Sequence, residues 1–570
     1  MFPLPGRQKE NYREEGKKEF WEKIRFKILV FISIVLFAIA IAPKSLQNDT
    51  FYTIKVGEYI AQNGIFHLTE DTFSWHELPY TYPHWLYDLG MYFIYHQAGQ
   101  LGVYLSTIIF SAILGGVIYL SCSRFSKNKI VSYIITILTM YMLKPYLAAR
   151  AQLVTFILFA FAVYNIEAFL ETGKKRYTIA LFVIPILITN LHCAVFPFYF
   201  ILFLPYIGEY LWITVLDCFL DYRLLWLILR ILEKVPFLKM DKKEKIHQKR
   251  EKIKSVIEKK KEKTQFRREN PYKIKVTKNK LVKWLIVIFV ITAFTGFLNP
   301  MGDGAYTYTY KIYKGNTTDS INEHLPVTLI ESKEFLFSIC LFLGILIFTD
   351  TKIKLSDLFF LGGLLTLALM SRRQISMYAI FCSTILAKLV AAMFEKYDKR
   401  TCQKIFKIAA SSFGTLFIIL AFSIHTVNCL QDMKKNNKSF VDESTYPVEA
   451  CTWIKENLDL NTLKIYNEYN YGSYMLFRGI PVFIDSRCDL YSPEFNGDKK
   501  NDIEGRDIFS DALNIAGIAV DYNKKFDEYG VTHVISYSNS KLVMLLKEDK
   551  GYHRIYEDDH FSIFERVTKE

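Results

Sequence analysis

Carboxylates follow the first apolar segment of this chain and are its first candidates for chemistry. Asp49 comes directly after the apolar run 25–42, and Glu70 and Asp71 lie about twenty residues further on. A carboxylate can accept a proton from a hydroxyl or amine as that group attacks a substrate. Asp49, Glu70 and Asp71 are therefore the predicted catalytic residues, with Asp49 as a general base.

Other polar side chains also stand at the ends of apolar segments. A single membrane-edge Arg is more often a lipid-facing anchor, and a single His is more often a packing residue. Several such groups on one side of a membrane instead favour a shared polar cavity, and Arg pairs match phosphate oxygens well. The predicted substrate-binding set is Arg150, Gln152, Asn190, His192, Asn299, Glu323, His324, Arg372 and Arg373.

Long apolar segments must position these residues. Of the 570 residues, 51% are hydrophobic, and the apolar runs approach the roughly 20 residues that a membrane helix needs. We predict an α-helical polytopic membrane protein with about eleven spans. The expected spans are 25–42, 101–122, 130–146, 151–171, 176–190, 193–214, 282–299, 333–349, 354–370, 373–395 and 406–428. The segment 84–97 is interpreted as an interfacial helix, with a twelfth span as the alternative.

The distribution of charge orients these spans. The net charge is +14, and residues 241–280 contain 17 Lys and Arg against 6 Asp and Glu. The positive-inside rule places this block in a cytoplasmic loop, 215–281, together with a basic N-terminus, 1–24. The basic block therefore does not indicate nucleic-acid binding. Twelve spans would place it outside, so eleven are favoured.

With this orientation, every polar cluster falls on the outer side of a transmembrane domain at 25–428, whose first outer loop is 43–100. The first apolar run has no small-residue cleavage site and is interpreted as a retained helix. Within the inner loop, "LDYRLLWLILRILEKVPF" has apolar residues at helical spacing and predicts an interfacial helix.

The chain changes character after residue 428. Strand-length apolar runs ("LKIYNEY", "IPVFIDS", "THVISYS", "FSIFER") alternate with helix-like stretches ("VEACTWIKENL", "SKLVMLLKED"). This alternation predicts an α/β domain at 429–570. Its position after an odd number of spans predicts that it is extracytoplasmic. Asp485, Arg487 and Asp489 follow a predicted strand and are candidates for binding a glycan. An internal ion pair between Asp485 and Arg487 is the equal alternative.

The nine cysteines show no metal-binding spacing. Those in apolar runs are interpreted as packing residues. A disulfide among Cys429, Cys451 and Cys488 is left open.

Several motifs together resemble one family. They are "DTFYTIKVGEYIAQNGIFHLTEDTFSWHELPYTYPHWL", "NLH", "NPMG", "NEHLP", "SRRQ" and "PVFIDSRCDLY". The chain resembles type C (GT-C) glycosyltransferases, polytopic enzymes that use polyprenyl-phosphate sugars. Within them it is similar to a bacterial branch related to protein O-mannosyltransferases and the aminoarabinose transferase of lipid A. His324 stands where Trp is common in that branch, and Thr72 replaces an expected Pro.

The resemblance implies transfer of a sugar, in the cell membrane, from a polyprenyl-phosphate donor to an extracytoplasmic lipid, glycan or protein acceptor. Members of the family differ in metal dependence, so a divalent metal ion is left open. Glu70, Asp71 and His192 are its predicted ligands. The alternative for Asp71 is that it caps a local turn through backbone N–H groups.

Two other functions remain as alternatives, a transporter or flippase of lipid-linked sugars and a glycan-binding membrane protein without catalysis. Transporters often contain internal repeats and midplane polar residues. No repeat is evident here, and the polar residues gather at one surface.

Overall fold

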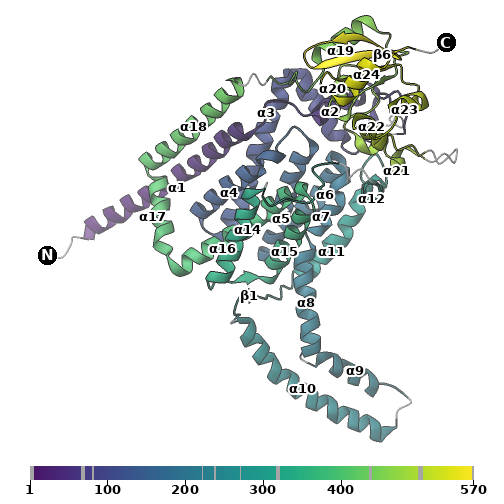
Figure 1. Ribbon diagram of the computed structural model, residues 1–570. Helices are drawn as coiled ribbons and strands as arrows, with labels where there is room; N and C mark the ends of the chain where they lie inside the picture. Colours follow the sequence, from purple (N-terminus) through teal and green to yellow (C-terminus); the bar gives the residue numbers. More distant parts are fainter. Residues whose placement is uncertain are drawn as a thin grey trace.

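The computed structural model describes most of the chain. The described residues are 5–65, 71–79, 82–220, 222–236, 239–269, 271–315, 321–330, 332–435, 439–497 and 505–567. Figure 1 shows a helical bundle with the C-terminal segment at one end and a helical hairpin projecting from the other.

The bundle consists of helices that follow the predicted apolar segments. They are α1 (Pro5–Ile41), α3 (Trp85–Ser126), α4 (Lys129–Leu143), α5 (Ala151–Thr172), α6 (Lys175–Leu191), α7 (Phe196–Ile201), α8 (Leu204–Leu220), α11 (Val282–Thr292), α14 (Lys333–Phe348), α15 (Leu355–Met370), α16 (Ile375–Tyr397), α17 (Lys399–Ala410) and α18 (Ser412–Lys435). Short 3₁₀ turns extend or precede some of them: η2 (Lys144–Tyr146), η3 (Cys193–Val195), η4 (Ala293–Phe297) and η5 (Arg372–Gln374). Each predicted segment therefore contains a helix.

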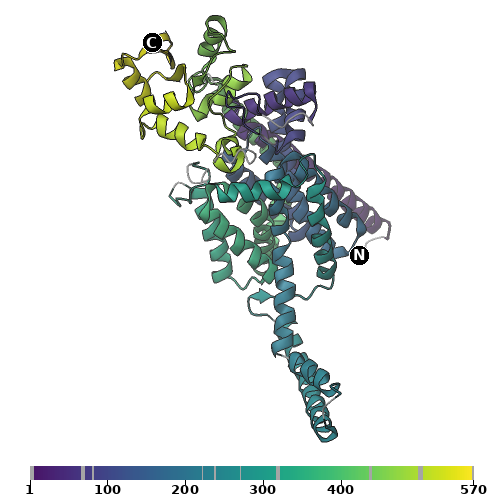
Figure 2. The ribbon, with the colours of Figure 1, turned by 90° about the vertical axis from the view of Figure 1, so that its right-hand side faces the viewer.

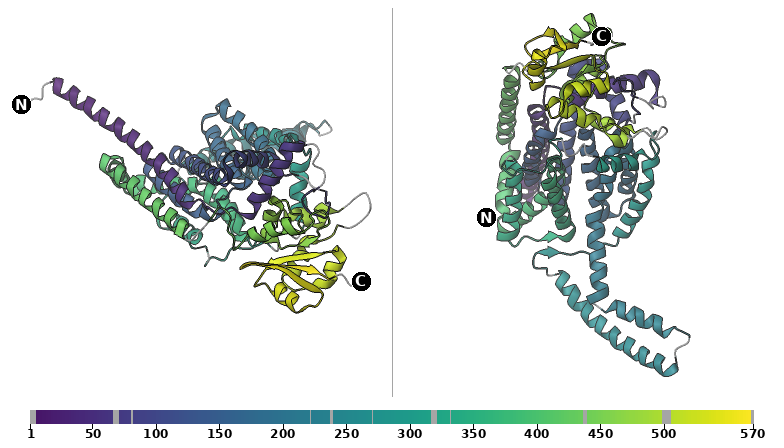
Figure 3. Two further views of the ribbon diagram at one scale, coloured as in Figure 1. Left: turned by 90° about the horizontal axis from the view of Figure 1, so that it is seen from above. Right: turned by 45° about the vertical axis from the view of Figure 1, so that its right-hand side comes forward.

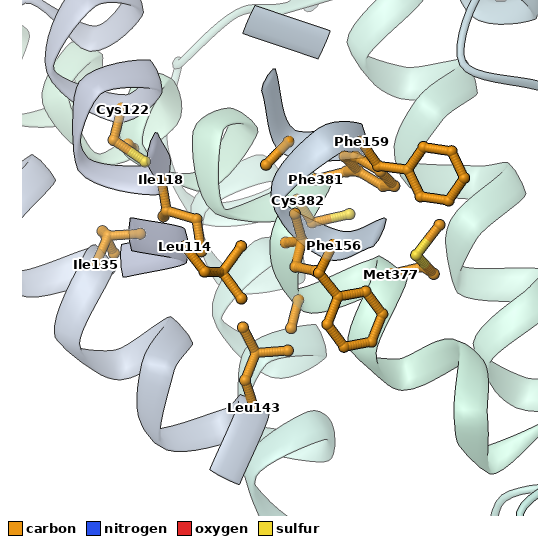
Figure 4. Close-up of a cluster of buried hydrophobic side chains, with 14 of the residues drawn as sticks. Leu114, Ile118, Cys122, Ile135, Leu143, Phe156, Phe159, Met377, Phe381 and Cys382 are labelled. Atoms are coloured by element: carbon orange, nitrogen blue, oxygen red, sulfur yellow. The ribbon is translucent and has the colours of Figure 1, made fainter. Parts of the chain in front are cut away.

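Length and apolar character identify a multi-pass membrane protein. Within the described residues, six helices are long and apolar enough to cross a membrane, and Val282–Phe297 and Leu355–Met370 are shorter apolar helices. Their outward faces expose apolar side chains such as Leu105, Ile109 and Ile134. Their inward faces form a continuous core, in which side chains of α3, α4, α5 and α16 pack together (Figure 4). The predicted number of eleven spans stays a prediction.

The first outer segment differs from the predicted loop. Residues Asn48–Asn63 form helix α2, which ends at Gly64. Segment 84–97 forms a helix of its own, as predicted: α3 runs from Trp85 to Ser126, but two helices meet within it at Gly99, where the backbone is not helical. Its interfacial position stays a prediction. Gly99 has a φ of 57°, a left-handed conformation that glycine adopts at little cost. Gly99 therefore separates a first helix at the polar end of the bundle from a second helix that enters its core.

The basic insert is also helical. The predicted interfacial stretch forms α9 (Arg223–Glu233), and α10 (Met240–Glu269) covers most of the basic block. Both project from the bundle at the end away from the C-terminal segment (Figures 1 and 2). Two short parallel strands, β1 (Ile274–Lys275) and β2 (Ile353–Lys354), join the end of this insert to the bundle. Helix α12 (Gly304–Lys314) lies at the opposite end.

The C-terminal segment contains a four-stranded sheet in the order β3-β4-β6-β5 (Figure 3). Its strands are β3 (Ile465–Tyr466), β4 (His533–Tyr537), β5 (Tyr552–Glu557) and β6 (Phe561–Arg566). Only β3 and β4 are parallel. The helices are α19 (Val448–Asn457), α20 (Tyr469–Phe477), η6 (Cys488–Tyr491), α21 (Pro493–Asn496), α22 (Ile508–Ala516), α23 (Tyr522–Tyr529) and α24 (Lys541–Glu548). The predicted alternation of strands and helices is confirmed, and Cys429, Cys451 and Cys488 are free thiols.

The strand predicted at "IPVFIDS" is wrong. This segment makes only an isolated bridge, between Val482 and Ser74 of the first outer segment. The side chain of Asn467 takes the place of a neighbouring strand, since its amide donates to the Ile484 carbonyl at 2.6 Å. Its oxygen accepts from the Phe483 N–H at 2.8 Å. The argument that Asp485, Arg487 and Asp489 end a sheet strand therefore fails.

The C-terminal segment and the first outer segment share one hydrophobic core. Phe51 of α2 lies 5.0 Å from the Tyr446 ring and 5.1 Å from the Tyr474 ring, measured between centroids. Helix α2 in turn packs closely on α3, because Gly57 leaves room for the Asp88 carbonyl. A Cβ atom at Gly57 would lie only 2.1 Å from that oxygen. The position of α2, and so of Asp49, depends on both contacts.

We expect Gly57→Ala to lower the free energy of unfolding by about 1–3 kcal/mol, because the added methyl group forces α2 away from α3. Thermal unfolding of the detergent-purified protein measures this change. Gly90→Ala is the matched control, since a Cβ there meets nothing within 4 Å. Equal stability of the two variants would contradict the proposed close contact.

Candidate active site

One arginine joins three segments that are far apart in the sequence. Arg150, at the N-cap of α5, lies with Nη2 2.6 Å from Oδ2 of Asp49 in the first turn of α2. Its Nη1 lies 3.2 Å from Oε1 of Glu323. All three side chains are partly exposed, so a ligand can reach them. The predicted convergence of Asp49, Arg150 and Glu323 is therefore present in the structure.

Arg373 belongs to the same cluster. Its backbone N–H donates to the Glu323 carbonyl at 2.9 Å, and its charge acts on Glu323, His324 and Asp489. Burial by itself raises the pKa of Glu323, but the charges of Arg150 and Arg373 outweigh burial and place this pKa below its ordinary value. Burial and Arg373 together lower the pKa of His324. At neutral pH, Glu323 is thus ionised and His324 is an uncharged ring.

A buried histidine pair, which the sequence analysis did not identify, lies beside this cluster. Nδ1 of His84 is 2.7 Å from the Asp88 carboxylate, and its Nε2 is 2.9 Å from the Tyr52 hydroxyl. Burial lowers the pKa of His84, but the charge and the hydrogen bond of Asp88, together with the charge of Asp49, outweigh burial and raise this pKa above its ordinary value. The charges of Asp49 and Arg150 also act on His84. In the sequence, the i, i+4 spacing of His84 and Asp88 in "HWLYD" was the signal that could have identified this pair.

His192 lies next to His84. Its ring lies 6.2 Å from that of His84, and its Nδ1 is 3.0 Å from the Thr155 hydroxyl on α5. The predicted residue His192 therefore adjoins the cluster through His84.

The C-terminal segment contributes Asp489 to the cluster. The Tyr308 hydroxyl of α12 donates to Oδ2 of Asp489 at 2.8 Å. Burial raises the pKa of Asp489, while the charges of Arg373 and His84 act in the opposite sense. Asp489 is thus the member of the predicted glycan set that faces the arginine cluster.

Asp71 lies in a different, fully buried ion network. Nη1 of Arg487 is 2.7 Å from Asp71 Oδ1, and Nη2 is 2.7 Å from Asp485 Oδ2. Asp71 also accepts from the Ser74 N–H at 2.9 Å, so the predicted turn-capping alternative is confirmed. The internal pair of Asp485 and Arg487 is confirmed as well. This network joins the first outer segment to the C-terminal segment.

The contacts of Asp71 do not fit a metal ligand. Both of its oxygens are engaged, and a guanidinium group 2.7 Å away repels a divalent cation. Glu70 lies outside the described residues. Among the residues that the structure describes, no group of three His, Cys, Asp or Glu side chains is placed to hold a metal ion.

The remaining predicted residues have structural contacts. Asn190 accepts from Trp85 Nε1 at 3.1 Å, while its own amide donates to the Leu298 carbonyl. Asn299 accepts from the Met301 N–H at 2.7 Å and so orders its turn. The Arg372 guanidinium contacts the Pro326 carbonyl and Thr328. Gln152 lies in the first turn of α5, next to Arg150.

We expect Arg487→Gln to lower the free energy of unfolding by about 3–5 kcal/mol, because it leaves two buried carboxylates without their counter-charge. Thermal unfolding and limited proteolysis of the C-terminal segment measure the effect. Arg566→Gln is the matched control, since its partner Asp527 is 71% exposed and such surface pairs contribute about 1 kcal/mol or less. Similar losses in both variants would contradict the network's role.

Comparisons with known proteins identify the fold. Neither a scan of protein-family models nor a search of curated proteins gives a match. Among solved structures, the chain is similar to the archaeal oligosaccharyltransferase AglB from Archaeoglobus fulgidus in complex with an inhibitory peptide and a dolichol-phosphate. The identity is 14% and the TM-score 0.51, over 96% of this chain and 74% of that one.

The apo form of the Archaeoglobus fulgidus oligosaccharyltransferase gives 13% identity and a TM-score of 0.50, over 91% of this chain and 70% of that one. ArnT from Cupriavidus metallidurans in the apo state gives 10% identity and a TM-score of 0.46, over 95% and 97%. The similarity to the oligosaccharyltransferase covers the bundle and the C-terminal segment alike. The chain therefore has the fold of the GT-C membrane glycosyltransferases.

Proposed function

We propose that the chain is a membrane glycosyltransferase that moves a sugar from a polyprenyl-phosphate donor to an extracytoplasmic acceptor. The observation that carries this proposal is the cluster of Asp49, Arg150, Glu323 and Arg373, beneath the C-terminal segment. The GT-C fold supports it, and one of the similar structures contains a dolichol-phosphate. The basic insert at the other end favours an extracytoplasmic location for the cluster.

The arginines bind the donor in this proposal. Guanidinium groups pair with phosphate oxygens through charge-assisted hydrogen bonds. Arg150 already holds two carboxylates, so a phosphate that reaches it competes with Asp49 and Glu323. Binding of the donor thus releases the Asp49 carboxylate at the place where the acceptor arrives. The charge of Arg373 also acts on Glu323, His324 and Asp489, which we assign to the wall of the donor site.

Asp49 then acts as the general base. The acceptor's hydroxyl or amine attacks the anomeric carbon and gives its proton to Asp49. The bond from the anomeric carbon to the phosphate oxygen breaks, and its electron pair leaves with the polyprenyl phosphate held by Arg150 and Arg373. One direct displacement inverts the anomeric configuration. No covalent intermediate with the protein is needed.

We expect Asp49→Asn to lower transfer by a factor of about 100 or more, because an amide cannot accept the proton. A deletion strain complemented with each variant provides the test, with mass spectrometry of its surface glycans, lipids and proteins. Glu58→Gln is the matched control on the same helix, since Glu58 pairs only locally with Lys55. A wild-type glycan profile with correctly folded Asp49→Asn protein would contradict the base and favour a flippase or glycan-binding protein.

We expect Arg373→Gln to weaken binding of undecaprenyl phosphate by about 10- to 100-fold, the effect of losing a hydrogen bond to a charged group. Titration of the purified protein with this lipid measures the dissociation constant. The neighbouring Arg372→Gln is the matched control, because its side chain contacts the segment 326–328. An equal loss of affinity in both variants would contradict a specific contact between Arg373 and the phosphate.

A further inference from the structure

A polar cavity lies at the end of the bundle opposite the Arg150 cluster. Its volume is about 430 Å³, and it is enclosed by α3, α5, α8, α11, α15 and α16 together with the β1 and β2 segments. Arg150 precedes α5, whereas Glu171 in the cavity wall is near the end of that helix. At 1.5 Å per residue, about 30 Å separates the two sites. This cavity is therefore independent of the proposed glycosyl-transfer site.

The acidic groups in its wall already have partners. Lys388 lies 3.0 Å from Glu167 and 2.9 Å from Asp357, and these three side chains are largely buried. Arg124 lies 2.9 Å from Glu171. The fourth acid, Glu209, accepts from the Thr277 N–H at 2.9 Å. The carboxylates are thus held in place by the protein's own groups.

The basic groups exceed these acids. The wall contains Arg124, Lys127, Lys275, Lys352, Lys354 and Lys388, six cations against four acids, a difference of +2. Lys354 interacts electrostatically with Glu167 and Asp357. Lys275 and Lys352 have no ion pair within the described part of the chain, and both are exposed at the edge of the cavity. Lys127, at the end of α3, likewise has no ion pair among the described residues. Two of these three lysines therefore lie along the β1–β2 edge.

The backbone forces the lysines of this edge together. Lys275 and Lys354 are directly paired residues of the parallel strands β1 and β2. Like charges in directly opposed positions destabilise a sheet, and two strands alone are only marginally stable. Lys352 immediately precedes β2, and both Lys352 and Lys354 are exposed whereas Ile353 between them is buried. An anion bound between these lysines would relieve the repulsion.

We propose that this cavity binds a phosphate-bearing anion, with Lys275 and Lys352 as its principal contacts. Basic pockets between membrane helices at the cytoplasmic side suit the headgroups of anionic lipids. A soluble phosphate ester carries the same binding chemistry. The ligand adds to the pairing of β1 with β2, and so fastens the end of the α9–α10 insert to the bundle.

Titration of the full-length protein in neutral detergent tests this proposal. The probes are dihexanoyl phosphatidylglycerol, dihexanoyl phosphatidylcholine and glycerol 3-phosphate, each measured by isothermal titration calorimetry. We expect Lys275→Gln/Lys352→Gln to weaken binding of the anionic probe at least tenfold. Lys275→Arg/Lys352→Arg should retain it, which separates loss of charge from loss of folding.

The control removes the same charge elsewhere. Lys245→Gln/Lys252→Gln changes two exposed lysines of α10, outside the cavity wall, and should alter affinity less than twofold. Binding of phosphatidylglycerol alone identifies a lipid ligand, and binding of glycerol 3-phosphate as well identifies recognition of the phosphate ester itself. Equal weakening by the cavity and control variants, or equal binding of phosphatidylcholine, would overturn the proposal. Glycosyl transfer is not the readout, so this result is independent of the proposed function.

Discussion

The two-sided ion pair of Arg150 is the constraint on which the polar end of the molecule depends. A guanidinium group can hold two carboxylates at once, and here Nη2 holds Asp49 while Nη1 holds Glu323. These acids come from α2 and from the segment that precedes α14. If Arg150 were neutral or absent, two carboxylates would face each other with Arg373 as the remaining nearby cation. The cluster is thus arranged by charge, while α2 and α5 supply the positions.

Hydrophobic packing keeps those positions fixed. Phe51 anchors α2 against tyrosines of the C-terminal segment, and Gly57 lets the same helix approach α3. The Asp71–Arg487–Asp485 network ties the two segments together once more, with all three side chains buried. Such a network contributes little net stability compared with apolar packing, but it tolerates only one arrangement of its members. The chain thus combines an adaptable, partly exposed ion cluster with a rigid buried one.

The sequence was sufficient for the bundle because apolar length and charge asymmetry are strong, local signals. It was also sufficient to bring Asp49, Arg150, Glu323 and Arg373 to one end of the molecule. It was not sufficient for contacts between distant segments. Asp71 has the same residue type as Asp49 and a similar setting, and only its partner Arg487, more than 400 positions away, distinguishes them.

Local patterns also misled where a side chain replaced backbone pairing. The run "IPVFIDS" has strand composition, yet the amide of Asn467 satisfies its backbone and no sheet forms there. Conversely, His84 and Asp88 have the spacing of residues that meet on one helix face, but the sequence did not show that their hydrogen bond is buried. The spacing of two residues along a helix predicts whether their side chains can be in contact. Burial determines the electrostatic effect of that contact.

The shared core has a consequence for how the chain is made. Phe51 of α2 and Tyr446 belong to one apolar core, although about 395 residues separate them in the sequence. At ribosomal rates of about 5–20 residues per second, α2 waits on the order of 20–80 s for the partners that cover it. During this interval its apolar surface is open to the membrane edge or to a chaperone. A nascent chain interrupted before residue 446 would leave the ribosome with that surface permanently uncovered.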